Sequence, residues 1–478
     1  MATHPLRLEN PTIVARTDAR PAMVTAFLGG AIVAWGAAGG TVDHAQLSIC
    51  LLASLAWMAT RLDPTLIAVT GALALTAVTV LAGGVASSPL AHLGDDTTVL
   101  IVGAFVLAKA VDRSGLAAAL TDRVIGSASG RFALARLGCG VFATTFLIPA
   151  TSARASVLVP VVERAKARAT TRGAQRTIAL MAPLIVVLGA IASPIAAGAN
   201  LLAIQVLTAQ TGEPLSFATW IAAAAPFGLL ISVVAVVVAW ALFRHDDRAP
   251  DAVAATAEGA AADVGDPAAK YRVALVLAGA VVLWTTAGVH PLEPTLVAIL
   301  AAVLVTLPGY GALTLPQALK GVDWALIVLL AAAAQIGEVV SGNGLVATGV
   351  DDTARMIAGL DAAAVPIVIG ALALVAMLAH LVVTSRTARA ALLLPGSLAI
   401  AAAAGLDPAV AALTVAAGTG FCILTPVGSK ALLVFAGSGG ADLARNDLYR
   451  SGSIILPVQL LLTLVFALWV WPSLVGGA

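Results

Sequence analysis

Runs of apolar residues long enough to cross a membrane recur along almost the whole chain. A helix needs about 20 such residues to cross the hydrocarbon core of a bilayer. Backbone polar groups cannot stay unpaired in lipid, so these runs form helices, whereas a transmembrane β-barrel requires short segments of alternating polarity. Only 11% of the residues are charged, against about a quarter in soluble domains. The pattern therefore predicts an all-α polytopic membrane protein.

The apolar runs divide into about eleven candidate spans. Two further apolar stretches, 131–165 and 362–403, are each interrupted by a polar cluster that contains arginine, and each then continues into a proline. Irregular backbone at membrane depth is tolerated where it is buried in protein or lines a cavity. We therefore expect two re-entrant hairpins, with their polar clusters as candidate binding sites. The expected spans are 23–41, 46–61, 65–84, 97–113, 176–209, 216–243, 271–288, 293–309, 323–342, 406–437 and 452–474.

The distribution of basic residues predicts one orientation in the membrane. Cytoplasmic loops carry an excess of Lys and Arg, and arginines flank the hairpin 131–165 on both sides. If successive spans cross the membrane in alternating directions from this hairpin, the N-terminus lies in the cytoplasm and the C-terminus lies outside. The membrane expected is a bacterial-type plasma (inner) membrane. The segments then expected outside contain Arg355 as their only Lys or Arg; they are 85–96, 210–215, 289–292 and 343–361.

The composition also predicts the domain boundaries. Residues 245–269 are rich in Ala, Asp and Pro, which is typical of a flexible linker. We expect a cytoplasmic N-terminal segment at 1–22, a first half at 23–244, a cytoplasmic linker at 245–270 and a second half at 271–478. Each half contains one of the two hairpins.

Three segments of the first half recur in the same order in the second half. Residues 99–120 resemble 326–349, IPATSARASVLVP (148–160) resembles VTSRTARAALLLP (383–395), and 189–202 resemble 420–433. The predicted topology places the two copies in opposite orientations. Inverted repeats of this kind are typical of secondary transporters, whose substrate sites lie at the repeat interface near the middle of the membrane.

These segments resemble the divalent-anion/sodium symporter (DASS) family, within the wider ion-transporter superfamily that includes citrate and arsenite permeases. The resemblance covers nearly the whole chain. In that family each hairpin tip carries Ser-Asn-Thr, usually extended to Ser-Asn-Thr-Ala-Thr-Ala-Ala and ending in a proline. Each following broken helix carries a Thr-Pro loop. Tips and loops together form the sodium and carboxylate sites. The resemblance implies a homodimer in which a scaffold domain holds a transport domain that moves as an elevator.

The hairpin tips of this chain differ from that family pattern in their charge. Counting back from Pro160, the first tip reads Ala-Thr-Ser-Ala-Arg over 150–154; counting back from Pro395, the second reads Ser-Arg-Thr-Ala-Arg over 385–389. Arginine therefore replaces threonine at both fifth positions. A sodium site is built from oxygen donors, and a guanidinium, which stays protonated in proteins, repels the ion. We therefore assign no metal site and do not carry the sodium coupling over from the resemblance.

Two roles are open for these arginines. An arginine presents a planar fork of donors that suits carboxylate, sulfate or phosphate oxygens, and hydroxyl groups and helix N-termini beside it would add further donors. Alternatively, each arginine caps exposed backbone carbonyls or pairs with an acidic residue. His380, just before the second tip, is either a proton relay or a buried histidine bonded to a backbone carbonyl. The candidate substrate-binding residues are Thr151, Ser152, Arg154, Asn200, Ser385, Arg386, Thr387, Arg389, Thr425, Ser429 and Lys430.

The leading functional hypothesis is a secondary active transporter of a small di- or polyanion, either sodium-independent or an exchanger. The alternatives are a sodium-coupled divalent-anion symporter and an arsenite-type efflux permease or channel subunit. No metal pair, nucleophile elbow or phosphate loop lies near the tips, so an enzyme is not expected. The expected partners are an anionic substrate, the lipid bilayer and a second copy of the chain, with no cofactor and no nucleic acid.

Overall fold

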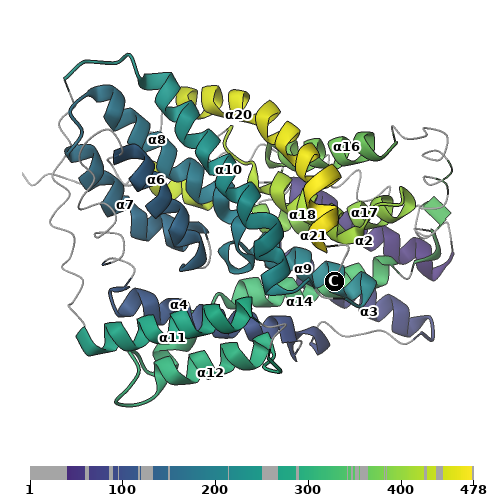
Figure 1. Ribbon diagram of the computed structural model, residues 1–478. Helices are drawn as coiled ribbons and strands as arrows, with labels where there is room; N and C mark the ends of the chain where they lie inside the picture. The colour runs from purple at the N-terminus through teal and green to yellow at the C-terminus, as the bar shows by residue number, and fades with distance from the viewer. Residues whose placement is uncertain are drawn as a thin grey trace, which may run out of the picture.

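The structure is a computed structural model, and every regular element among its described residues is a helix (Figure 1). The expected N-terminal segment, most of the first span and most of the linker lie outside the described residues. The described residues are 40–59, 64–84, 90–94, 96–116, 119, 133–148, 151–213, 215–249, 267–286, 290–341, 343–345, 348–349, 352, 355, 364–381, 383, 385–424, 428–437 and 445–475.

The helices of the first half follow the expected spans closely, except that span 176–209 is broken into α8 and α9, joined by two short 3-10 turns. The expected hairpin 131–165 consists of α6, a 3-10 turn and α7. The elements are α2 (Val42–Ala59), α3 (Pro64–Leu81), η1 (Ala91–Gly94), α4 (Asp96–Arg113), α6 (Ala133–Ala143), η2 (Thr144–Phe146), α7 (Thr151–Ala167), α8 (Arg172–Leu188), η3 (Gly189–Ala192), η4 (Pro194–Ala196), α9 (Gly198–Thr211) and α10 (Phe217–Phe243).

The second half repeats this order of elements. Its span 406–437 is likewise broken, into α18 and α19, and α11 begins at Pro267, slightly before the expected residue 271. The elements are α11 (Pro267–Thr285), α12 (Pro294–Thr306), α13 (Leu315–Leu319), α14 (Trp324–Ser341), α16 (Ala364–Leu378), η6 (Ala379–Leu381), α17 (Arg386–Ala403), α18 (Pro408–Gly420), α19 (Lys430–Gly437), α20 (Arg445–Val465), the π-helical turn η8 (Phe466–Val470) and α21 (Trp471–Val475).

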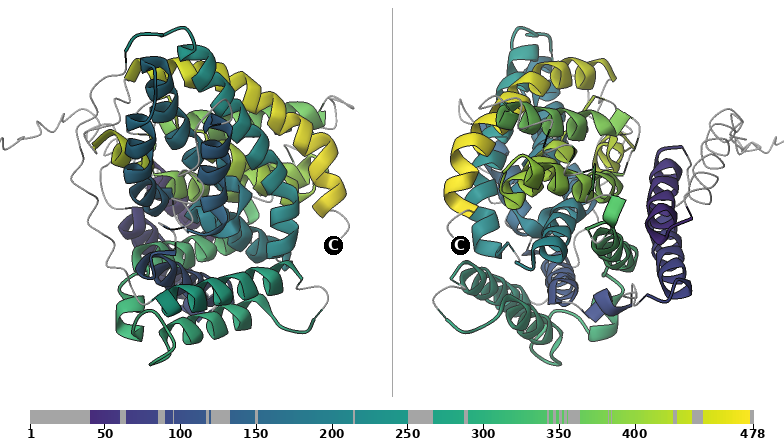
Figure 2. Two further views of the ribbon diagram at one scale, coloured as in Figure 1. Left: turned by 60° about the vertical axis from the view of Figure 1, so that its left-hand side comes forward. Right: turned by 90° about the vertical axis from the view of Figure 1, so that its right-hand side faces the viewer.

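The two halves pack by exchanging equivalent helices. The second hairpin arm of the first half, α7, packs against α19 of the second half, and α17 of the second half packs against α9 of the first. The same exchange joins α4 to α12 and α14 to α3. In both views of Figure 2, as in Figure 1, α11 and α12 lie together along the lower edge, apart from α17 and α18. The core of each half is therefore completed by the other half.

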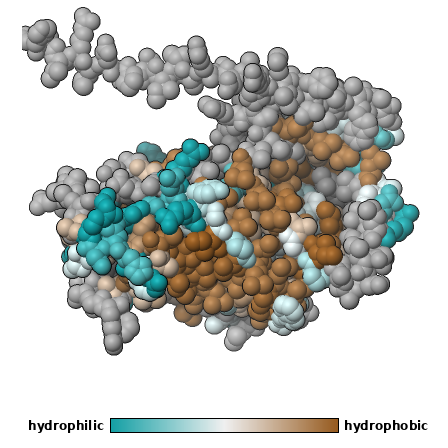
Figure 3. Space-filling model, turned by 90° about the horizontal axis from the view of Figure 1, so that it is seen from above, coloured by the Kyte–Doolittle hydropathy of each residue, from teal (hydrophilic) through white to brown (hydrophobic). Residues whose placement is uncertain are grey.

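The outer surface is suited to lipid. Three helical segments of the described residues, Arg172–Ala192, Phe217–Phe243 and Arg445–Val475, are long and apolar enough to cross a membrane, and shorter apolar helices accompany them. A broad hydrophobic area covers the face seen in Figure 3, with hydrophilic residues gathered beside it. Exposed apolar side chains such as Val237 on α10 and Leu461 on α20 contribute to this kind of surface. Exposed apolar side chains of this kind suit contact with lipid, which offers no partners to polar groups.

A charged cluster ties together three helix ends. Arg176 on α8 donates to both carboxylate oxygens of Asp447 on α20, at 3.0 and 2.9 Å, and lies 3.7 Å from Asp246 just after α10. Its guanidinium also lies over the Phe243 ring. Arg248 donates to Asp246 and holds the pKa of that carboxyl below its usual value. The cluster fixes the start of α8 and α20 against the end of α10.

Glycines allow the broken helices to approach their neighbours closely. A Cβ at Gly418, near the end of α18, would lie 2.5 Å from the Cβ of Ala376 on α16. A Cβ at Gly189, where α8 ends, would lie 2.7 Å from the Ser232 hydroxyl on α10. Real Cβ atoms do not approach this closely, so these contacts require glycine.

The Gly418→Ala substitution is expected to destabilise the protein by about 1–3 kcal/mol, because the added methyl group overpacks α16 against α18. Thermal unfolding in detergent, followed by tryptophan fluorescence, measures the effect. Gly279→Ala on α11 is the matched control, since nothing lies within 4 Å of its added Cβ, and it should leave the unfolding temperature unchanged or slightly higher. Equal unfolding temperatures for the two variants would contradict the assigned packing.

Candidate functional site

The two polar clusters of the sequence lie at the start of equivalent helices. The first, at Thr151, begins α7, and the second begins α17, where the Ser385 hydroxyl caps the helix by accepting from the Ala388 amide. Each helix contains an internal proline, Pro160 or Pro395. Both clusters lie against the broken helices, because α7 packs on α8 and α19 while α17 packs on α18 and α9.

Arg154 is completely buried and binds the end of the first broken helix. Its guanidinium donates to the Val186 carbonyl at 2.9 Å. Val186 lies in the last turn of α8, where carbonyls have no partner within the helix and the helix dipole is negative. Two further nitrogens of this guanidinium, Nε and Nη1, are buried without a hydrogen-bond partner among the described residues. Arg154 thus places a positive charge at a helix C-terminus.

Arg389 occupies the equivalent position in the second half. It is also completely buried, and it donates to the Thr419 carbonyl in the last turn of α18 at 2.9 Å. A second bond, of 2.7 Å, goes to the Val383 carbonyl in the hairpin tip. The two fifth positions of the sequence motif therefore have the same structural role. Each joins its own hairpin tip to the end of the broken helix that follows it.

Arg386 connects the two broken helices with one another. Its guanidinium donates to the Val187 carbonyl of α8 and to the Ala416 carbonyl of α18, each at 3.3 Å. A third bond, also of 3.3 Å, goes to the side-chain oxygen of Asn200. Unlike Arg154 and Arg389, it is only partly buried. Of the three arginines, Arg386 has the longest bonds and the greatest access to its surroundings.

Asn200 holds the unwound segment between η3 and α9. Its amide nitrogen donates to the Ala190 carbonyl at 2.8 Å and to the Ser193 carbonyl at 2.9 Å. Because its oxygen accepts from Arg386, this fully buried side chain has partners at both ends. Asn200 therefore supports the backbone on which Arg386 is placed.

The remaining predicted residues are divided between the two tips and the second broken helix. Thr387 lies beside the first residue of α9, because a Cβ on Gly198 would come within 3.0 Å of its hydroxyl. The buried Ser429 hydroxyl accepts from the Ala431 amide at the start of α19, and Lys430 beside it is exposed. Thr425 lies outside the described residues. Thr151, Ser152, Ser385 and Thr387 are all half-buried.

Sequence reasoning missed two residues that bind backbone in the broken segments. The indole of Trp220 on α10 donates to the Ile191 carbonyl, and the amide of Gln459 on α20 donates to the Ala417 carbonyl. Both side chains are buried. Their signal was a polar group within a long apolar run, which in a membrane protein predicts a buried partner. His380 has the second of its two expected roles, with Nδ1 2.6 Å from the Met377 carbonyl.

The site therefore combines three guanidinium groups, the C-terminal ends of two broken helices and the N-termini of α7, α9 and α17. In secondary transporters, such half-helix ends at the repeat interface bind the substrate and the coupling ions. The fold and site together define a polytopic transporter with a repeated broken-helix core.

Comparison with known families agrees with this class. The model of the sodium:sulfate symporter transmembrane region matches residues 31–476. The chain belongs to the sodium:sulfate symporter family, and it is a membrane transporter of anions.

The fold is similar to that of solved structures. One of them is the Alcanivorax borkumensis YdaH transporter, whose crystal structure is described as having an unusual topology. The TM-score is 0.59 at 15% sequence identity, and the match covers 90% of this chain and 98% of that one. Among curated proteins, none matches the chain. The structural similarity concerns the fold alone.

The Asn200→Ala substitution is expected to lower stability by about 1–3 kcal/mol for each buried carbonyl that loses its donor. It should also weaken transport, because Arg386 loses one of its three partners. Thermal unfolding and uptake by reconstituted vesicles measure the two effects. The exposed Asn446 provides the matched control, Asn446→Ala, which should change neither. An Asn200→Ala protein with wild-type stability would show that these hydrogen bonds do not hold the unwound segment.

Proposed function

We propose that this protein is a secondary active transporter of a small di- or polyanion, such as a dicarboxylate or an inorganic oxyanion. It moves its substrate by elevator-type alternating access, does not require sodium and works most simply as an anion exchanger. The observation that carries the proposal is the placement of Arg154, Arg386 and Arg389 at the C-terminal ends of α8 and α18. In line with the sequence expectations, we further propose a homodimer in a bacterial-type inner membrane with a cytoplasmic N-terminus.

The arginines support independence from sodium. Unwound carbonyls and half-helix C-terminal ends are the groups with which secondary transporters coordinate sodium. Here the carbonyls of Val186, Val187 and Thr419 accept hydrogen bonds from guanidinium groups instead. A guanidinium is permanently charged, so it supplies the positive charge that a sodium ion would bring, and it repels a second cation.

The same arginines support an anionic substrate. The hydrogen bonds of Arg154 and Arg386 go to backbone carbonyls and to the Asn200 amide oxygen, which are neutral acceptors. Neutral acceptors stabilise a guanidinium but do not balance its charge, and unbalanced charge at membrane depth is costly. A bound di- or polyanion would balance it. An empty site would cross the membrane less readily than an occupied one, which favours exchange of one anion for another.

The burial of each residue supports a division of roles. Arg154 and Arg389 are fully enclosed and act as fixed cations that hold the helix ends. Arg386 is partly accessible and begins α17, where helix N-termini favour anions. We assign Arg386 as the main contact of the anion, with hydroxyl donors from Thr151, Ser152, Ser385 and Thr387. In this assignment Asn200, Ser429 and Lys430 do not contact the anion directly but fix the backbone around it.

The Arg386→Gln protein is expected to lose at least about 90% of anion uptake. The substitution removes a guanidinium that donates paired, charge-assisted hydrogen bonds to the substrate. Uptake of labelled dicarboxylate, sulfate and phosphate by vesicles preloaded with the same anion measures the loss. Arg445→Gln removes the same charge from an exposed position at the start of α20 and should transport normally. The assignment fails if a correctly folded Arg386→Gln protein, judged by size-exclusion elution, exchanges anions at the wild-type rate.

The wild-type protein is expected to exchange anions equally well in sodium and in choline buffers. The Arg154→Thr variant restores a hydroxyl where this chain carries arginine and frees the Val186 carbonyl. Its uptake should fall severalfold in choline and recover in part with sodium, because sodium can then bind the vacated oxygens. A strict sodium requirement of the wild type would instead establish the sodium-coupled symporter, and this result would overturn the proposal.

A further inference from the structure

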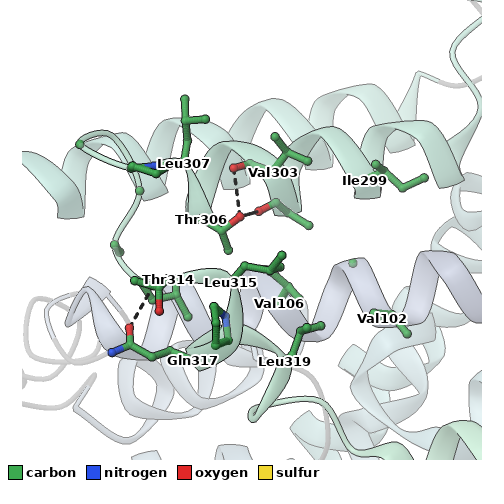
Figure 4. Close-up of a pocket in the computed structure, with 18 of the residues that line it drawn as sticks. Val102, Val106, Ile299, Val303, Thr306, Leu307, Thr314, Leu315, Gln317 and Leu319 are labelled. Carbon is green, nitrogen blue, oxygen red and sulfur yellow. Dashed lines mark hydrogen bonds between the residues drawn. The ribbon is translucent and has the colours of Figure 1, made fainter.

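An apolar groove lies between α4, α12 and α13, at the edge of the molecule that is apart from the broken helices (Figure 4). Its volume is about 850 Å³, within the range of about 300–1,000 Å³ that is common for ligand sites. Figure 4 shows α12 on one side, with Val303 and Thr306, and α13 and α4 on the other, with Leu315 and Val106. The proposed anion path does not include this groove.

The chemistry of the groove suits an alkyl chain. The Thr306 hydroxyl on its wall already donates to the carbonyls of Ala302 and Val303. The Gln317 side-chain oxygen is likewise occupied, since it accepts from the Thr314 amide. The other lining side chains are mostly Val, Leu and Ile. A polar molecule would find few partners there, whereas methylene groups would bury apolar surface.

Basic side chains border the groove at the segment between α12 and α13 and at the end of α13. Arg272, on α11, donates to the Gly309 carbonyl of the segment that lines the groove. Lys320 is exposed at the end of α13. The methylene groups of Lys109 on α4 pack against Gly321, where an added Cβ would come within 2.8 Å of them. Three basic side chains from three different elements therefore lie next to residues that line or adjoin the groove.

Aromatic residues place this end of the groove at the membrane surface. The Arg272 guanidinium lies 5.3 Å from the centre of the Tyr310 ring. Tyr271 and Trp324 are exposed nearby in the chain, by 76% and 50%. Tyr and Trp side chains with this exposure are typical of the lipid headgroup level. The positive-inside pattern of the sequence predicts that this is the cytoplasmic leaflet.

We propose that the groove is a binding site for an anionic phospholipid of that leaflet. One acyl chain lies along Val303 and Leu315, and the headgroup phosphate lies among Arg272, Lys320 and Lys109. Charge complementarity identifies the occupant: basic pockets between transmembrane helices on this side bind anionic headgroups, and a zwitterionic lipid would gain only the apolar contacts.

Native mass spectrometry of the full-length protein in neutral detergent tests the proposal, with phosphatidylglycerol and phosphatidylcholine of identical acyl chains as probes. Phosphatidylglycerol should bind at least about tenfold more tightly. Each of Arg272→Gln and Lys320→Gln should weaken it about fivefold. Arg445→Gln, which removes an exposed charge elsewhere, should leave the affinity within twofold of the wild type.

A second pair of variants tests the groove itself. Val303→Trp fills the groove and should reduce phosphatidylglycerol binding at least about tenfold, whereas Leu461→Trp, on the exposed face of α20, should not. Equal binding of the two lipids, or equal losses in Val303→Trp and Leu461→Trp, would overturn the proposal. The same holds if Val303→Trp converts a dimer to a monomer without changing lipid binding, because the groove would then be occupied by a second copy of the chain.

Discussion

The contact between the guanidinium groups of the hairpin tips and the carbonyls of broken helix ends is the interaction on which the rest of the structure depends. A helix that stops inside a membrane protein leaves its last carbonyls without partners, and lipid offers no water to replace them. Arg154, Arg386 and Arg389 supply these partners from the hairpin tips. The breaks in α8 and α18 therefore require the hairpins, and the hairpins require the breaks, so that the site forms as one unit.

Much of this architecture could be predicted from the sequence, because it depends on composition and on the length and spacing of the apolar runs. The spans and the hairpin tips follow from apolar runs and polar interruptions, which act locally along the chain. The breaks between α8 and α9 and between α18 and α19, by contrast, lie within runs expected to be continuous. The partner of each arginine could not be predicted in the same way. Arg386 and its acceptor Val187 lie 199 residues apart, and sequence reasoning left open whether the arginines contact substrate or cap carbonyls. The capping contacts are now placed, whereas contact with substrate stays a proposal.

Polar side chains within apolar runs were harder to interpret from the sequence. Trp220 lies fully buried with its indole on the Ile191 carbonyl, although its position near the start of a span also fits an interfacial aromatic. The helix α13 has only five residues, too few to show a helical spacing of apolar residues. Neither this helix nor the groove beside it could therefore be predicted. In both cases tertiary packing decided between interpretations that the local sequence allowed equally.

The exchange of helices between the two halves has a consequence for how the chain is made. The first half contains α9, but the helix that covers it, α17, belongs to the second half. At about 5–20 residues per second, synthesis of the intervening chain takes on the order of ten seconds. During that time α8 ends in carbonyls whose partner Arg386 does not yet exist. The newly made first half must therefore wait in the membrane as an incomplete structure until the second half inserts beside it.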